Sequence, residues 1–142
     1  ARFYAAISES YQPLLIVLLV TGARWGEATA LQVRDLDASQ AFYEKYLGLE
    51  RSPAGPPHAV VFATAPIAFA VRDVVPGTDL ASVPQPGLGV AIWLHATEVQ
   101  SIHDALAADG HTIVVAPFNG PFGRTFTFAD PDGYHVTLHD RA

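Results

Sequence analysis

Alternating apolar and polar positions near the C-terminal end of the chain predict a β-hairpin. Two phenylalanines alternate with threonines over 124–129, and apolar residues again occupy every second position over 134–139. Between these segments, Pro131 and Gly133 supply the fixed and the positive backbone angles of a tight turn. The sequence therefore predicts two antiparallel strands that share one apolar face, with Arg124 as a candidate ion-pair partner for the two aspartates of the turn.

Two segments with helical periodicity predict helices of similar length. Apolar residues recur every three or four positions over 38–47 and over 98–109, so each helix presents one apolar face. Asp37 and Thr97 each stand three residues before a glutamine, which is the spacing of a capping box, and a glycine follows each helix. We expect each helix to cover one face of a sheet.

Each predicted helix is preceded by one apolar strand candidate and followed by three more, so the order βαβββ occurs twice. Residues 74–87 are rich in proline and glycine and predict a linker between modules of about 28–73 and 88–140. The expected fold is α+β: two βαβββ modules that form a cupped mixed sheet around a cleft, preceded by an N-terminal helical segment. The strand candidates are 28–33, 49–52, 58–64 and 67–72 in the first module and 89–96, 112–116, 124–129 and 134–139 in the second.

Composition narrows the possible functions. The 142 residues are 50% hydrophobic and contain no cysteine, which excludes disulfides, thiolate metal sites and a cysteine nucleophile. A formal charge of -6 works against binding to phosphate backbones and suits neutral or cationic ligands. The apolar run 14–20 is too short to span a membrane. We expect a globular, cytoplasmic protein that binds neither nucleic acid nor membranes.

Three motifs carry a resemblance to a known family. They are the segment 33–48 (VRDLDASQAFYEKYLG), the strand and helix of 93–110, and the segment 128–134 (FADPDGY). With these motifs, about residues 31–139 resemble the vicinal oxygen chelate superfamily, which includes glyoxalase I, extradiol dioxygenases, fosfomycin-resistance enzymes and the bleomycin resistance proteins. The resemblance covers roughly three quarters of the chain.

Enzymes of that superfamily usually hold a divalent metal with His, Gln or Glu from the first strand of each half and Glu from a late strand of each. Matched onto this sequence, those positions fall on Ala28, Ala91 and Thr137, and on Phe69 or Ala70. None of these residues is a normal metal ligand. The resemblance therefore implies no cofactor, and it points to the bleomycin-resistance branch, which sequesters a drug in clefts that two chains form together.

Aromatic side chains are candidates for the wall of a ligand pocket. Trp93 lies in phase with the small Ala91 on its strand, and Phe62, Phe69 and Phe126 are plausible neighbours. Flat aromatic faces can stack on an aromatic or cationic group. The alternative interpretation is that the phenylalanines fill the core.

Three histidines are further candidates because they share a face with the pocket positions. His95 is in phase with Ala91, and His135 and His139 are in phase with Thr137. His95 and His135, together with Thr137, complete our predicted ligand-binding set. A metal site displaced from the usual positions is one alternative, and exposed or hydrogen-bonded histidines are the other.

The first residues of the chain resemble a different family. The motif 21–27 (TGARWGE) is similar to the segment around the first catalytic arginine of tyrosine recombinases, the phage-integrase family, and Arg24 falls on that arginine. The remaining recombinase motifs and a basic surface are missing. We therefore interpret residues 1–27 as a helical recombinase-like remnant fused to a glyoxalase/bleomycin-resistance-like domain of 28–142.

These observations lead to a functional hypothesis with two alternatives. The first is a dimeric protein without catalytic residues that binds and sequesters a small molecule, such as a cationic antibiotic, in an aromatic-lined acidic cleft. The second is a metal-dependent lyase, isomerase or dioxygenase-type enzyme of the same superfamily whose ligands lie elsewhere. The third is a non-catalytic interaction module.

Overall fold

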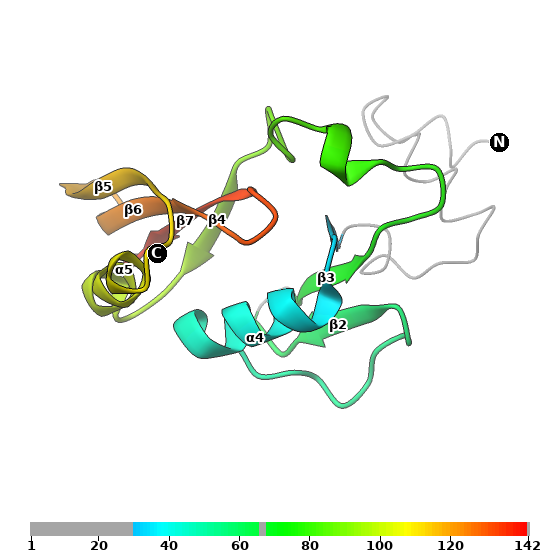
Figure 1. Ribbon diagram of the computed structural model, residues 1–142. Coiled ribbons are helices and arrows are strands. Elements are labelled where there is room, and N and C mark those ends of the chain that lie inside the picture. Colours follow the sequence, from blue (N-terminus) through cyan, green and yellow to red (C-terminus); the bar gives the residue numbers. More distant parts are fainter. Residues whose placement is uncertain (1–29, 66–67, 142) are drawn as a thin grey trace, which may run out of the picture.

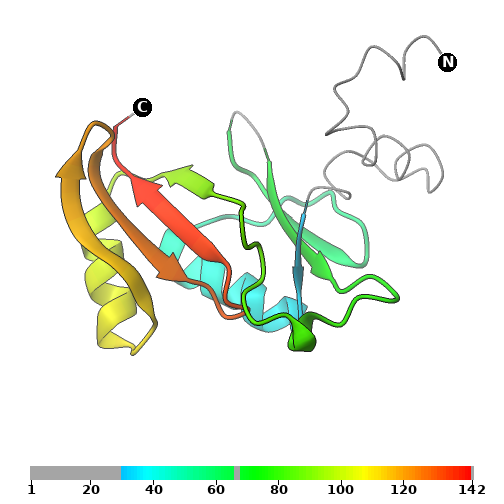
Figure 2. The ribbon, with the colours of Figure 1, turned by 90° about the horizontal axis from the view of Figure 1, so that it is seen from above.

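The structure, a computed structural model, describes residues 30–65 and 68–141. The expected N-terminal helical segment and the start of the first strand lie outside the described residues. Within them the architecture is α+β, as predicted, with two small sheets and two helices (Figure 1). The modules lie side by side (Figure 2).

In the first module, a three-stranded sheet has the order β1-β3-β2, with β1 parallel to β3 and β2 antiparallel to it. Helix α4 packs against this sheet, and both of its largest buried side chains, Phe42 and Tyr43, join the core. The elements are β1 (Leu31–Val33), α4 (Leu36–Leu47), β2 (Ala59–Phe62) and β3 (Phe69–Asp73).

The second module repeats this topology in complete form. Its sheet has the order β4-β7-β6-β5, again with a parallel pair between the first and the last strand. The elements are β4 (Ile92–His95), α5 (Val99–Ala108), β5 (Ile113–Gly120), β6 (Gly123–Ala129) and β7 (His135–His139). The predicted linker includes a short 3-10 helix, η2 (Leu80–Ser82). The shared strand order confirms the internal repeat.

The predicted strand over 49–52 is reduced to an isolated β-bridge at Arg51. Backbone hydrogen bonds continue only to Ser52, whose N–H donates to the carbonyl of Val61 at 2.8 Å. Pro53 follows and has no N–H to donate, so the pairing cannot continue. The first sheet therefore has one strand fewer than the second.

The helix starts differ from the predicted capping pairs. Asp35, not Asp37, caps α4: its backbone is extended and its carboxylate accepts from the N–H of Ala38 at 2.9 Å. Helix α5 follows Glu98 without a side-chain cap, so Thr97 does not cap it either. The predicted glycine stop of α4 is confirmed, because Gly48 is left-handed at φ 62°.

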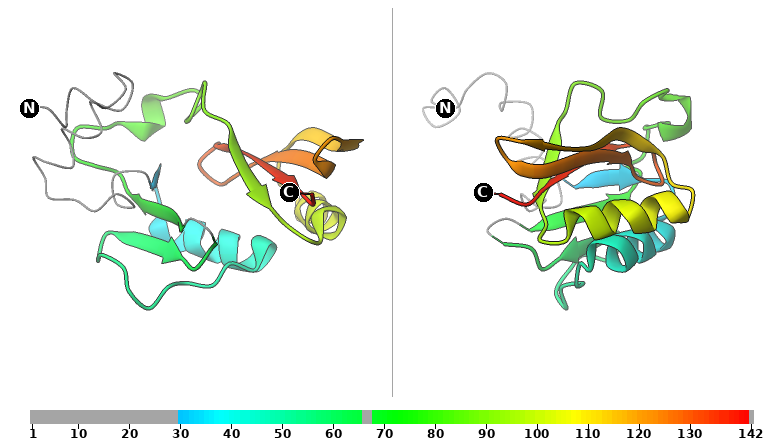
Figure 3. Two further views of the ribbon diagram at one scale, coloured as in Figure 1. Left: turned by 180° about the vertical axis from the view of Figure 1, so that it is seen from behind. Right: turned by 90° about the vertical axis from the view of Figure 1, so that its left-hand side faces the viewer.

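In the part of the chain that the structure describes, one hydrophobic core runs through both modules. Helices α4 and α5 lie next to each other (Figure 3), and the ring of Phe42 on α4 packs 5.8 Å from that of Phe128 on β6. The ring of His111 also meets Phe42 edge-on at 5.1 Å. Aromatic burial therefore joins the modules as well as filling each one.

The tight turn between β6 and β7 is a polar joint between the modules. Asp132 is buried, and its Oδ1 accepts from the backbone N–H of Arg34 at 2.9 Å and from Arg34 Nε at 2.8 Å. The hydroxyl of Tyr43 donates to Asp130 Oδ2 at 2.8 Å. Arg124, the expected ion-pair partner of these aspartates, does not contact them; its guanidinium donates to the side chain of Gln100 instead.

Burial of this joint shifts the pKa values of two of its groups. Desolvation raises the pKa of the Asp130 carboxyl above its ordinary value, although three hydrogen bonds to it act in the opposite direction. Burial, followed by the nearby Asp130 carboxylate, raises the pKa of the Tyr43 hydroxyl well above its ordinary value. The Tyr43 hydroxyl therefore stays protonated and donates its hydrogen bond at neutral pH.

The substitution Asp132→Ala should lower the free energy of unfolding by about 1.5–3 kcal/mol, because it removes the buried carboxylate that accepts charge-assisted hydrogen bonds from Arg34. Urea unfolding measures this change. The control Asp37→Ala removes an exposed aspartate from the first turn of α4, and should cost less than about 1 kcal/mol. Equal effects of the two substitutions would contradict the role assigned to the joint.

The Asp130→Asn variant should change how stability depends on pH. In the wild type the folded state holds the Asp130 proton more tightly than the unfolded state, so this group makes stability fall as pH rises from 3.8 through the raised folded pKa. Asparagine does not titrate, so the stability of the variant minus that of the wild type should increase over this pH window. Urea unfolding at several pH values between 4 and 7 tests this, and parallel stability curves would refute it.

Candidate functional site

One face of the second sheet carries no helix and displays aromatic, histidine and threonine side chains. The register of the parallel pair sets Trp93 opposite Thr137 and His95 opposite His139. Directly paired residues point to the same face, so the rows continue across β6 and β5. We call this surface the open face; by the pairing register its members are Trp93, His95, Val115, Phe118, Thr125, Thr127, His135, Thr137 and His139, of which Thr125 is buried.

The opposite face of this sheet packs into the core and contains Phe126, which is 0% exposed and meets the ring of His103 edge-on. Phe62 is also 0% exposed, and it stacks on Phe69 with ring centres 5.8 Å apart. The structure therefore places Phe62 and Phe126 in the core, away from Trp93. Strand periodicity alone does not say which of the two faces the helix covers.

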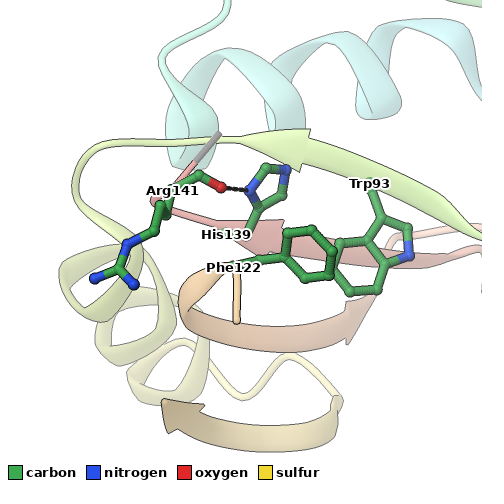
Figure 4. Close-up of a pocket in the computed structure, with 4 residues that line it drawn as sticks. All are labelled: Trp93, Phe122, His139 and Arg141. Carbon is green, nitrogen blue, oxygen red and sulfur yellow. Dashed lines mark hydrogen bonds between the residues drawn. The ribbon is translucent and has the colours of Figure 1, made fainter. Parts of the chain in front are cut away.

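A cavity of about 420 Å³ lies beside Trp93 and is lined by Trp93, Phe122, His139 and Arg141 (Figure 4). The ring centres of Trp93 and Phe122 are 5.4 Å apart in an edge-on arrangement, and His139 lies 5.8 Å from Trp93. The guanidinium of Arg141 points away from these rings, while its carbonyl oxygen accepts a hydrogen bond from His139 (Figure 4). The cavity is therefore lined mainly by the aromatic rings of Trp93, Phe122 and His139.

Phe122 was not among the predicted site residues. It stands in the turn between β5 and β6, flanked by Pro121 and Gly123, and is 51% exposed. An aromatic residue at such a turn is a signal in the sequence, since a turn offers it no core to enter. Only the folded hairpin brings it to Trp93.

A larger cavity of about 1020 Å³ lies between the modules. The end of α4, the loop after it and Phe69 line one side, and β4 with the start of α5 lines the other. Trp93 and His139 line both cavities, so we describe the two cavities together as the Trp93 cleft. Of the predicted ligand-binding residues, the cleft brings together Trp93, Phe69 and His95, and it adds His139 to them.

Among residues 30–65 and 68–141, the charged side chains that line the cleft are Lys45, Glu98 and Arg141. Two are cations and one is a carboxylate, so the acidity of the whole chain is not concentrated here. The expectation of an acidic cleft is wrong, because net charge says nothing about where carboxylates lie.

A polar network holds the wall of the cleft where α4 ends. The Tyr46 hydroxyl donates to Asp109 at 2.6 Å, Lys45 contacts the same carboxylate at 2.8 Å, and His111 lies 2.9 Å from the hydroxyl. The hydrogen bond with Asp109 raises the pKa of Lys45, and the same bond lowers the pKa of Asp109. The network ties the ends of the two helices together and so positions Tyr46 in the cleft wall.

His135 and Thr137 share the open face but do not line the cleft. The ring of His135 lies 3.2 Å from the amide of Gln85 in the linker. Thr137 exchanges a hydrogen bond with the Thr127 hydroxyl at 2.9 Å. Each of these predicted site residues therefore already has a polar partner within the protein.

The usual metal positions of the resembled family do not fit a metal here. Ala91, Phe69 and Ala70 carry no donor atom, and the Thr137 hydroxyl is bonded to Thr127. Ala28 lies outside the described residues. Over 30–65 and 68–141, no three His, Asp or Glu side chains are grouped so that they could hold a metal ion.

Comparison with known proteins establishes the family. The model of the Glyoxalase/Bleomycin resistance protein/Dioxygenase superfamily matches residues 27–138, so the chain belongs to this superfamily. No curated protein matches the chain significantly. None of these comparisons supports the recombinase-like interpretation of the first residues, which lie outside the described part of the chain. In the described part, no helix is both long and apolar enough to cross a membrane.

Several solved structures share the fold. The antibiotic binding protein TnmS3 from Streptomyces sp. CB03234 is 23% identical, with a TM-score of 0.60 over 80% of this chain and 92% of that one. The lactoylglutathione lyase from Agrobacterium tumefaciens is 24% identical, with a TM-score of 0.56 over 79% and 90%. The bleomycin resistance determinant encoded on the transposon Tn5 is 19% identical, with a TM-score of 0.55 over 79% and 93%. At these identities the likeness concerns the fold alone.

Proposed function

We propose that this protein binds and sequesters a small aromatic molecule in the Trp93 cleft without transforming it. The observation that carries the proposal is the exposed indole of Trp93, which remains 46% accessible and lines both cavities. An exposed indole beside a second exposed aromatic ring, Phe122, offers stacking surfaces that are already in place.

The chemistry of the remaining residues supports binding rather than catalysis. The usual metal positions carry alanine, phenylalanine and a hydrogen-bonded threonine. The fold is shared with an antibiotic binding protein and a bleomycin resistance determinant, which agrees with this function. Because the charges lining the cleft do not favour a cation, we propose an aromatic ligand without a required positive charge.

We further propose that the cleft is completed by a second copy of this chain. The open face and its rim carry exposed large apolar side chains, including Val115, Phe118 and Phe122. A partner that covers this face would bury them and enclose the ligand stacked on Trp93. The proposed active form is therefore a homodimer.

Ligand binding can be followed through tryptophan fluorescence, because the chain has only two tryptophans. We expect saturable quenching when chelator-treated protein is titrated with bleomycin or with an uncharged aromatic antibiotic. The Trp93→Phe variant should lose the response, and the matched Trp25→Phe variant should keep it. The measurement contradicts sequestration if binding requires an added divalent ion and the organic molecule is converted, since that outcome favours the lyase, isomerase or dioxygenase alternative.

The dimer proposal predicts a change of mass on one substitution. Phe118→Glu places a charge on the face to be buried and should convert a dimer into a monomer. Light scattering coupled to size-exclusion chromatography measures the mass. Ser101→Glu, at an exposed position of α5, should leave the dimer intact. A wild-type monomer, or equal behaviour of the two variants, would overturn the proposal.

A further inference from the structure

We propose that His95 and His139 form a two-histidine site for a divalent transition-metal ion such as Zn²⁺, Ni²⁺ or Cu²⁺. The site differs from the positions that the superfamily usually uses, which fall here on Ala91 and Thr137. His95 lies two side-chain repeats beyond Ala91, and His139 lies one repeat beyond Thr137. The two histidines are at the edge of the Trp93 cleft.

The register of the sheet places the two imidazoles together. His95 and His139 are direct partners in the parallel pair of β4 and β7, and their ring centres are 5.7 Å apart. Two imidazoles that share one tetrahedral ion, each bound at about 2.0–2.1 Å, have ring centres roughly 5 Å apart. The observed separation is slightly larger than this value, so we expect the two rings to turn toward each other when an ion binds.

The hydrogen bonding of His139 already selects the form that a metal needs. Its Nδ1 lies 2.9 Å from the carbonyl oxygen of Arg141 (Figure 4), and a carbonyl can only accept, so the bond places a proton on Nδ1. In the neutral ring, Nε2 then carries the lone pair. Metal-binding histidines are commonly oriented by this kind of bond to a backbone carbonyl.

The surroundings leave room for an ion and its remaining ligands. His95 is exposed, and both rings line the larger cavity, so the site is open to solvent. Imidazole suits Zn²⁺, Ni²⁺ and Cu²⁺ better than Mg²⁺ or Ca²⁺, which prefer oxygen donors. Two protein ligands leave the other positions of the ion to water.

Trp93 provides a built-in reporter, since its ring lies 5.8 Å from that of His139. Titration of the chelator-treated, tag-free Trp25→Phe protein with Cu²⁺ alone should quench the remaining tryptophan and saturate near one ion per chain. In this background, His95→Ala and His139→Ala should each weaken binding roughly tenfold or more, because one of two protein ligands is lost. His135→Ala is the matched control on the same strand and face, and should bind within about twofold of the parent.

Two further measurements keep the test decisive. Circular dichroism and thermal melting show whether each variant is folded, and electron paramagnetic resonance of the bound Cu²⁺ should show two nitrogen ligands that are reduced to one in either variant. Unchanged titrations in His95→Ala and His139→Ala, or an equal loss in His135→Ala, would overturn the proposal. Because no organic ligand is used, the result is independent of the sequestration experiment.

Discussion

The structure depends on the tight turn between β6 and β7, where two buried aspartates accept hydrogen bonds from the other module. Asp132 accepts from the backbone and side chain of Arg34 at the end of β1, and Asp130 accepts from Tyr43 on α4. Buried carboxylates are unfavourable unless their oxygens are satisfied, and docking of the modules supplies part of the hydrogen bonds that these oxygens need. This requirement specifies how the modules pack, and that packing forms the larger cavity between them.

The two modules share a topology, but only the second sheet contributes the open face. Both sheets pair their first and last strands in parallel, and both bury one face under a helix. In the second module, the uncovered face carries the exposed Trp93 and Phe118, together with a paired His95 and His139. Apolar side chains left in water at this density are typical of a surface that a ligand or a second chain covers. The proposed sequestration and the proposed metal site both follow from this one face.

Local patterns predicted several elements because their causes are local. The alternation over 124–129 and 134–139, the glycine stop after α4 and the repeated βαβββ order all reflect backbone geometry and side-chain period. The ends of the elements differ more from the prediction. Asp35 rather than Asp37 caps α4, and Pro53 ends the strand pairing that was expected over 49–52. These differences depend on how distant segments pack around each end, and a short window of sequence does not contain that information.

By itself, the sequence determined the class of fold, the repeat and the absence of usual metal ligands at Ala91 and Thr137. Tertiary structure decided which aromatic residues are available to a ligand: Phe126 faces the helix, whereas Trp93 faces the open side. It also decided that His95 and His139 are neighbours although 44 positions separate them, because the parallel pairing of β4 with β7 is made across the whole of the intervening α5, β5 and β6. Periodicity assigns residues to a face, and only the assembled sheets say which face is covered.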